Sequence, residues 1–173
     1  VHGSPTLGDL LGYRPALIAP FHPSCGLHDA LDFRDAAFVD TETTGLGMAG
    51  VYAFMVGVAT FEPAVGEDGL MHDHYVVRQL FMRSPAEEPA LLTVLAAMLE
   101  GKSLSVTFNG RAFDLPLLRA RYAANRPYLP SAARGGDLLA DHAPPLHLQH
   151  PARNLWQSRS PSRPLDNPTA TLP

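Results

Sequence analysis

The sequence predicts one α/β domain in which helices pack against a mixed β-sheet. Three apolar stretches rich in β-branched and aromatic residues follow one another at residues 36–40, 51–61 and 74–82. Two segments with apolar residues at helical spacing come next, with one more short apolar stretch between them. This order of three strands, a helix, a strand and a helix is typical of a mixed sheet covered by helices.

The first three strands are predicted to form an antiparallel meander. The first, AAFVD, is short and apolar, and the second, VYAFMVGVATF, is longer and interrupted by Gly57. The turn sequence EPAVGEDG leads to the third strand, HYVVRQLFM, which has the composition of a half-buried strand. Such close spacing favours antiparallel pairing of consecutive strands.

The clearest helix start in the chain lies at Ser84. Ser84 is a good N-cap, Pro85 suits the first helical position, and Glu87 would complete a capping box. An apolar stripe and a C-terminal glycine follow, at Leu91, Leu92, Leu95, Met98, Leu99 and Gly101. Residues 104–108 (LSVTF) then predict a fourth strand, and residues 114–125 a second helix.

The segments on either side of this pattern differ from it in composition. Residues 1–35 contain four prolines and little periodicity, which predicts an irregular lead-in with a short helix near residues 6–11. The domain itself is predicted over residues 36–156. Residues 157–173 hold four prolines, three serines and no aromatic residue, and we expect a disordered or aberrant tail there.

Composition limits the classes of function. A chain of 173 residues that is 46% hydrophobic can bury a core, while a net charge of −4 argues against binding nucleic acid through overall positive charge. The single cysteine, Cys25, excludes an internal disulfide and favours a cytoplasmic protein. With no apolar run of 18 residues, we expect no membrane span. The chain begins at Val1, which suggests a fragment or a processed product.

Two carboxylates, Asp40 and Glu42, stand at the end of the first predicted strand. Alternation along a strand places both on one face, where they would raise each other's proton affinity unless a cation lay between them. Hard oxygen ligands of this kind suit Mg²⁺ or Mn²⁺. For an isolated pair, a solvated surface turn would be the better interpretation. The apolar run before Asp40 favours the end of a central strand, where ligands bind in sheet proteins.

A second polar turn follows the fourth predicted strand. Asn109 ends that strand, Gly110 allows the turn, and Asp114 opens the next helix. Alone, Asp114 would be interpreted as a cap of that helix. Together with the first pair, it offers a third carboxylate to the same metal site.

These two stretches resemble a known enzyme superfamily. DTETTGL at residues 40–46 and NGRAFD at residues 109–114 resemble the first two motifs of the DEDD 3′–5′ exonucleases, which have a ribonuclease H-like fold. Residues 38–62, 79–92, 106–122 and 150–156 resemble the YprB-type subgroup of that superfamily, predicted exonucleases of bacteria. The resemblance covers most of the chain between Phe38 and Trp156.

The resemblance implies two-metal hydrolysis of phosphodiester bonds. In such enzymes two Mg²⁺ or Mn²⁺ ions lie about 3.5–4 Å apart. By resemblance, Asp40 would bridge both ions, Glu42 would bind one ion and the terminal 3′-hydroxyl, and Asp114 would hold the second ion directly or through water. The partner would be the single-stranded 3′ end of DNA or RNA. Asn109 would shape the groove, and the backbone near Thr43 and Leu46 would contact the last nucleotide.

The sequence departs from the superfamily after these motifs. A fourth carboxylate and a Tyr or His base belong to a third motif, but no tyrosine follows Tyr128, and His147 stands where the subgroup has an aspartate. None of the later aspartates, Asp137, Asp141 and Asp166, has the expected partner. We therefore expect a chain truncated before the third motif and a weak exonuclease. The alternative is an inactive remnant that keeps the fold and at most weak nucleic-acid or metal binding.

Three other signals are weaker. A phosphatase with an aspartate nucleophile would need D-x-D where this chain has Asp40 and Glu42. The histidines His142, His147 and His150 could bind zinc, but their spacing favours solvated loop residues. A basic bias in the second half fits either a strand-binding groove or ordinary solvated helix faces; it comes from Arg111, Arg119, Arg121, Arg126, Arg134 and Arg153.

Overall fold

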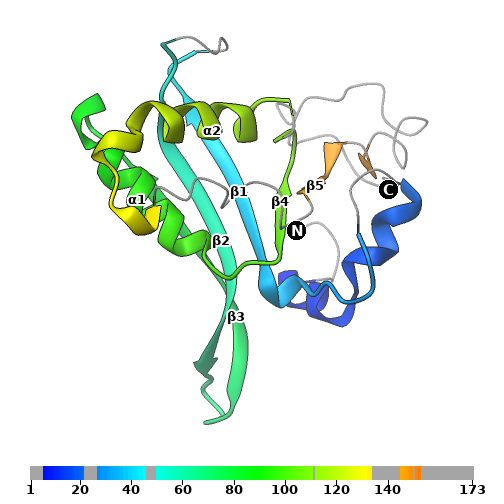
Figure 1. Ribbon diagram of the computed structural model, residues 1–173. Helices are drawn as coiled ribbons and strands as arrows, with labels where there is room; N and C mark the ends of the chain where they lie inside the picture. The colour runs from blue at the N-terminus through cyan, green and yellow to red at the C-terminus, as the bar shows by residue number, and fades with distance from the viewer. Residues whose placement is uncertain are drawn as a thin grey trace, which may run out of the picture.

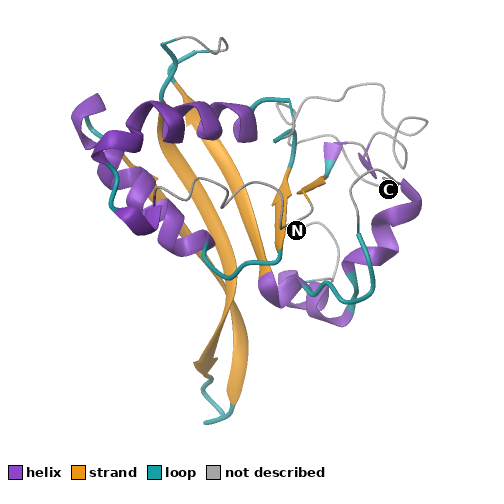
Figure 2. Ribbon diagram, viewed as in Figure 1, coloured by secondary structure: helices purple, strands orange, loops and turns teal. Residues whose placement is uncertain are grey.

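The structure is a computed structural model that describes residues 6–21, 27–45, 50–110, 112–133, 145–149 and 151–152. Its centre is a five-stranded sheet with the order β3-β2-β1-β4-β5 (Figures 1 and 2). The strands are β1 (Ala36–Thr43), β2 (Ala53–Val65), β3 (Met71–Phe81), β4 (Leu104–Thr107) and β5 (Pro145–His147).

The pairing confirms the predicted α/β class and the meander. β1 pairs antiparallel with β2, and β2 pairs antiparallel with β3. On its other side β1 is parallel to β4, which is in turn parallel to β5. The short strand β5 was not predicted, because three residues that begin with a proline give no periodic signal.

β1 is longer than its sequence predicted and runs through both carboxylates. Asp40 lies opposite Gly57 and Glu42 opposite Met55, with an irregularity in the pairing only after Glu42. Asp40 and Glu42 are therefore two positions apart on continuous strand and share one face of the sheet, as predicted.

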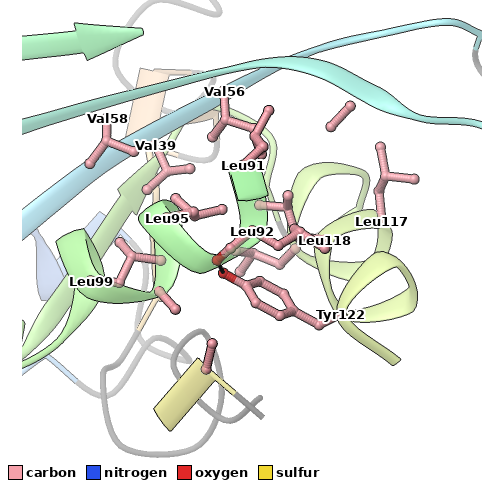
Figure 3. Close-up of a cluster of buried hydrophobic side chains, with 14 of the residues drawn as sticks. Val39, Val56, Val58, Leu91, Leu92, Leu95, Leu99, Leu117, Leu118 and Tyr122 are labelled. Atoms are coloured by element: carbon pink, nitrogen blue, oxygen red, sulfur yellow. Dashed lines mark hydrogen bonds between the residues drawn. The ribbon is translucent and has the colours of Figure 1, made fainter. Parts of the chain in front are cut away.

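Two helices, α1 (Glu88–Leu99) and α2 (Asp114–Asn125), pack on one face of the sheet (Figure 2). Figure 3 shows the valines of β1 and β2 meeting the leucines of both helices. The Tyr122 hydroxyl in α2 donates a hydrogen bond of 2.7 Å to the Leu92 carbonyl in α1. The labelled core residues are Val39, Val56, Val58, Leu91, Leu92, Leu95, Leu99, Leu117, Leu118 and Tyr122.

The other face of the sheet carries a second apolar cluster, which the N-terminal segment helps to form. The described residues of this segment include the 3₁₀ helices η1 (Leu7–Gly12), η2 (Pro15–Phe21) and η4 (Phe33–Asp35). η1 confirms the short helix predicted near residues 6–11. The second cluster consists of Leu31, Phe33, Ala36, Phe61, Leu104, Val106 and Leu146, with Leu10, Leu11, Ile18, Leu27, Phe38 and Tyr75 packed against it.

The start of the first long helix differs from its prediction. A 3₁₀ turn, η5 (Pro85–Glu87), precedes α1, and the described residues show no capping bond from the Ser84 side chain. The Glu87 carboxylate instead accepts the Arg83 backbone N–H at 2.8 Å, so the capping box is not formed. The end of α1 is as predicted, since Gly101 follows it with a positive φ of 75°.

Two further 3₁₀ turns, η6 (Arg126–Tyr128) and η7 (Ser131–Ala133), follow α2. None of the helices in the described part of the chain combines the length and apolar character needed to cross a membrane. Residues 157–173 lie outside the described residues, and the predicted domain boundaries at residues 36 and 156 stay predictions.

Candidate active site

The predicted site residues gather at one edge of the sheet. Because β1 and β4 are parallel, their C-terminal ends lie at the same edge. Asp40 and Glu42 belong to the last part of β1, and Asn109 follows the end of β4 (Figure 1). All three residues are exposed, so a ligand arriving from solvent can reach them.

Asp114 reaches the same edge of the sheet from helix α2. It is the first residue of α2 and only 6% exposed, and its Oδ1 accepts a hydrogen bond from the Thr41 hydroxyl. The helix cap is Phe113, so Asp114 is not the N-cap that its position alone suggested. Thr41 lies between Asp40 and Glu42 in β1, and its hydroxyl therefore ties the third carboxylate to the strand that carries the other two.

The electrostatics of Asp40 reflect its partial burial and the two neighbouring carboxylates. Partial loss of water raises the pKa of Asp40 above its ordinary value, and the negative charges of Asp114 and Glu42 raise this pKa further. A hydrogen bond from the Thr41 backbone lowers the pKa and offsets part of that effect. The edge of the sheet thus concentrates negative charge, and a cation bound there would relieve the repulsion.

The donor chemistry fits a hard divalent cation, but the side chains are not assembled into a coordination shell. Within the described residues, no three Asp, Glu, His or Cys side chains form a group that could hold one ion. Asp114 is engaged by Thr41, while Asp40 and Glu42 face the other side of β1. Carboxylate oxygens are nonetheless the ligands that Mg²⁺ and Mn²⁺ prefer.

Of the two residues predicted to contact the last nucleotide from the end of β1 and the loop after it, the structure describes one, Thr43. The Thr43 hydroxyl donates a hydrogen bond of 2.8 Å to the Gly45 carbonyl, which turns the chain directly after Glu42. Leu46 lies outside the described residues. On the neighbouring loop, the Asn109 carbonyl accepts the Ala112 backbone N–H at 3.1 Å and closes the turn that leads to Asp114.

A buried support beneath this second loop was missed by sequence reasoning. Thr107 Oγ1 accepts the Gly110 backbone N–H at 3.1 Å and lies 2.9 Å from Nδ1 of His147 in β5. His147 is only 2% exposed, so the interpretation of it as a solvated loop residue was wrong. Its burial depends on strand β5, which the sequence does not reveal. His142 and His150 lie outside the described residues.

The arginines of the second half differ in their surroundings within the described part of the chain. Arg121 is bound by the buried Glu88, whereas Arg119 and Arg126 are exposed. Arg111, Arg134 and Arg153 lie outside the described residues. The choice between a strand-binding groove and solvated helix faces therefore stays open for the exposed arginines.

Comparison with known proteins agrees with this mixed sheet packed with helices. The RNase_H superfamily matches residues 37–165, so the chain belongs to that superfamily. The match continues past Trp156, where we had expected the resemblance to end.

The chain is also similar to YprB of Bacillus subtilis (strain 168), a protein described as uncharacterized. The two are 34% identical over 123 residues, which is 70% of this chain and 25% of YprB. This similarity confirms the YprB-type resemblance. The chain matches about a quarter of the length of that relative.

Proposed function

We propose that this chain carries a metal-dependent 3′–5′ exonuclease domain of the YprB type, acting in the cytoplasm. Membership of the RNase_H superfamily suggests a nuclease with a nucleic-acid substrate. The observation that carries the finer proposal is the hydrogen bond between Thr41 and Asp114, residues 73 positions apart in the chain. This bond brings the carboxylate of the second motif to the strand that holds the pair of the first.

In this proposal Asp40, Glu42 and Asp114 hold Mg²⁺ or Mn²⁺, with two ions in the complete site. Bound ions of this kind activate a water molecule and stabilise the leaving 3′-oxygen. Asp40 and Glu42 are exposed and can meet a substrate, while the buried Asp114 is fixed by its hydrogen bond. In this proposal the residues of the chain supply the negative charge that holds the ions at a defined place, and the ions supply the catalytic chemistry.

The proposed substrate is a single-stranded 3′ end of DNA or RNA. Thr43 and Leu46 would contact the last nucleotide through their backbone, and Asn109 would line the groove on the other side of β1. The bend that Thr43 and Gly45 make after Glu42 supports this role, because it presents backbone groups beside the carboxylates.

A second candidate is a remnant that keeps the fold without catalysis. It is supported by the absence, in the described residues, of a group of three side chains able to hold one ion. It is also supported by the lack of a sequence match to the third exonuclease motif.

Digestion of end-labelled single strands tests both candidates. With Mn²⁺, the wild-type chain should shorten a 5′-labelled DNA or RNA strand stepwise from its 3′ end, and a strand blocked by a 3′-phosphate should resist. Asp40→Ala should abolish digestion, whereas Asp68→Ala, which removes an exposed carboxylate of the β2–β3 turn, should not. Digestion that survives Asp40→Ala would contradict the proposed site.

Calorimetric titration with Mg²⁺ or Mn²⁺ separates an enzyme from a remnant in the absence of substrate. Two bound ions, both lost in Asp40→Ala, would support a working site. One weak site, or none, together with no digestion by the wild-type chain, would establish the remnant.

A further inference from the structure

A buried polar cluster joins the two helices α1 and α2. Glu88, the first residue of α1, is only 3% exposed. Its Oε1 accepts a hydrogen bond of 2.7 Å from Nε of Arg121, and its Oε2 accepts one of 2.5 Å from Nη2 of Arg121. Oε2 also accepts Nδ2 of Asn125 at 2.6 Å. Both carboxylate oxygens therefore have partners, which is what a buried charge requires.

This cluster fixes a cation above an aromatic ring. The Arg121 guanidinium carbon lies 4.2 Å from the ring centroid of Tyr52, which is the geometry of a cation–π contact. The two hydrogen bonds that Arg121 donates to Glu88 hold the guanidinium plane in one orientation. The Arg121 guanidinium is therefore held in a fixed position and packs against the Tyr52 ring.

Tyr52 in turn holds the loop after β1 through its backbone. The Tyr52 N–H donates to the Thr44 hydroxyl at 3.1 Å, and the Thr44 N–H donates to the Tyr52 carbonyl at 3.0 Å. Thr44 directly follows Thr43, whose hydroxyl bonds the Gly45 carbonyl. The regular pairing of β1 with β2 shifts between Glu42 and Thr43, so these bonds hold the chain where the regular ladder is interrupted.

We infer that Arg121, anchored by Glu88 and Asn125, positions the loop at Thr43–Gly45 by supporting the Tyr52 ring. Arg121 and Tyr52 act through the loop and do not touch the reacting atoms, so they are positioning residues. The consequence for substrate binding rests on the proposed function, because the loop matters to a nucleotide only if the 3′ end lies there. The order of the loop itself does not rest on that function.

Hydrogen exchange at the Thr44 amide tests the positioning directly. Tyr52→Leu removes the ring and keeps the backbone, and it should speed exchange at Thr44 by about tenfold, in line with the loss of a partly buried cation–π contact. Tyr52→Phe keeps the ring and should leave this exchange rate near the wild-type value. Amides in the centre of β2 and β3 should not change in either variant.

A second variant tests the anchor without leaving a buried carboxylate alone. Glu88→Met/Arg121→Met removes both charges together, a replacement that buried ion pairs often tolerate. It should also speed exchange at Thr44, whereas Arg83→Met, which breaks the exposed pair with Glu87, should not. Unchanged exchange at Thr44 in both Tyr52→Leu and the double variant would overturn the inference.

Binding of a fluorescent single strand, measured with Ca²⁺ in place of Mg²⁺, tests the consequence. Tyr52→Leu should raise the Kd for the strand by about five- to tenfold. Tyr52→Phe, which keeps the ring, should have a Kd near the wild-type value. If the wild-type chain binds no strand while Thr44 exchange responds as expected, the proposed function is wrong and the positioning stands. If the wild-type chain binds and Tyr52→Leu binds equally well, the positioning role in binding is wrong.

Discussion

At the scale of single residues, the bond between Thr41 and Asp114 decides where the third carboxylate lies. Asp114 is almost fully buried, so a lost donor would leave a charged acceptor without compensation. Thr41→Val removes the hydroxyl at nearly constant shape and should lower the free energy of unfolding by about 1–3 kcal/mol. Urea denaturation at neutral pH measures this change.

Thr41→Ser is the matched control, because serine keeps the hydroxyl and loses only a methyl group. It should cost much less than Thr41→Val. Equal losses in the two variants would mean that the methyl group matters and the hydrogen bond does not. The double variant Thr41→Val/Asp114→Asn should recover part of the loss, since it removes the buried charge as well.

Asp40 makes the stability of the metal-free chain depend on pH. Its pKa is raised by desolvation and by the charges of Asp114 and Glu42. A raised pKa in the folded state contributes stability below the ordinary value of 3.8, and this contribution is lost as the pH rises through the folded pKa. The ionised Asp40 therefore destabilises the fold at neutral pH.

Asp40→Asn should accordingly make the chain more stable than wild type at pH 7 in the presence of a chelator. The difference should vanish below about pH 3, where the wild-type carboxyl is protonated. Adding Mn²⁺ should stabilise the wild-type chain, because a ligand that binds only the folded state stabilises it. The difference in stability between Asp40→Asn and wild type should therefore become smaller. Thermal unfolding at several pH values gives all three comparisons, and a less stable Asp40→Asn at pH 7 would contradict this account.

At the scale of elements, the turn between β4 and α2 depends on a close approach of backbone to side chain. A Cβ added at Gly110 would lie 2.6 Å from Cβ and 2.7 Å from Cγ2 of Thr107. Both are parts of a buried side chain that cannot move aside. The Gly110 carbonyl also accepts the Leu115 backbone N–H at 2.8 Å, which starts the helix that Asp114 opens.

Gly110→Ala should therefore destabilise the chain by about 1–3 kcal/mol, as overpacking of a filled site does. It should also reduce the proposed nuclease activity by more than the fraction unfolded, because it displaces the start of α2. Gly12→Ala is the control, since an added Cβ at Gly12 meets no atom of the described residues within 4 Å. A Gly110→Ala variant as stable and active as Gly12→Ala would show that the turn adapts.

The elements themselves were largely predictable from the sequence. The strands around Val39, Val56 and Val106 have apolar runs of ordinary length, and the helix over 114–125 begins and ends as predicted. Local patterns report periodicity, and these elements have it. β5 was missed because it is a three-residue strand held by its neighbour β4, so its existence is a tertiary effect.

The candidate site was predictable only as residue types at strand ends. Alternation along β1 was enough to put Asp40 and Glu42 on one face. The roles of Thr41 and His147 could not be predicted, because each depends on a partner that the fold brings from another element. The same is true of Arg121, whose charge fitted either a strand-binding groove or a solvated helix face, because its partner Glu88 lies on another helix.

At the scale of the whole molecule, the central part of the sheet is covered on both faces, whereas much of β3 is exposed. α1 and α2 form one core with it, and the N-terminal 3₁₀ segments help to form the other. Phe33, 4% exposed, belongs to the second core and stacks near Phe38 of β1. The N-terminal segment is therefore expected to support the strand that carries Asp40 and Glu42.

Phe33→Ala should lower the free energy of unfolding by about 3–5 kcal/mol, the usual cost of removing a buried aromatic ring. Leu17→Ala, at a residue that is 61% exposed in the same segment, should change it by less than about 1 kcal/mol. Denaturant unfolding of the two variants compares them. Similar small losses would mean that the second core contributes little to the stability of the sheet.

The position of β1 between an antiparallel and a parallel neighbour also sets the order in which the site can form during folding. Pairing with β2 closes a short stretch of chain, so Asp40 and Glu42 can come together early. The bond between Thr41 and Asp114 spans 73 residues and must wait until β2, β3, α1 and β4 lie in place. A chain still emerging from the ribosome would hold the first two carboxylates without the third, and the proposed hydrolysis would begin only when synthesis has passed α2.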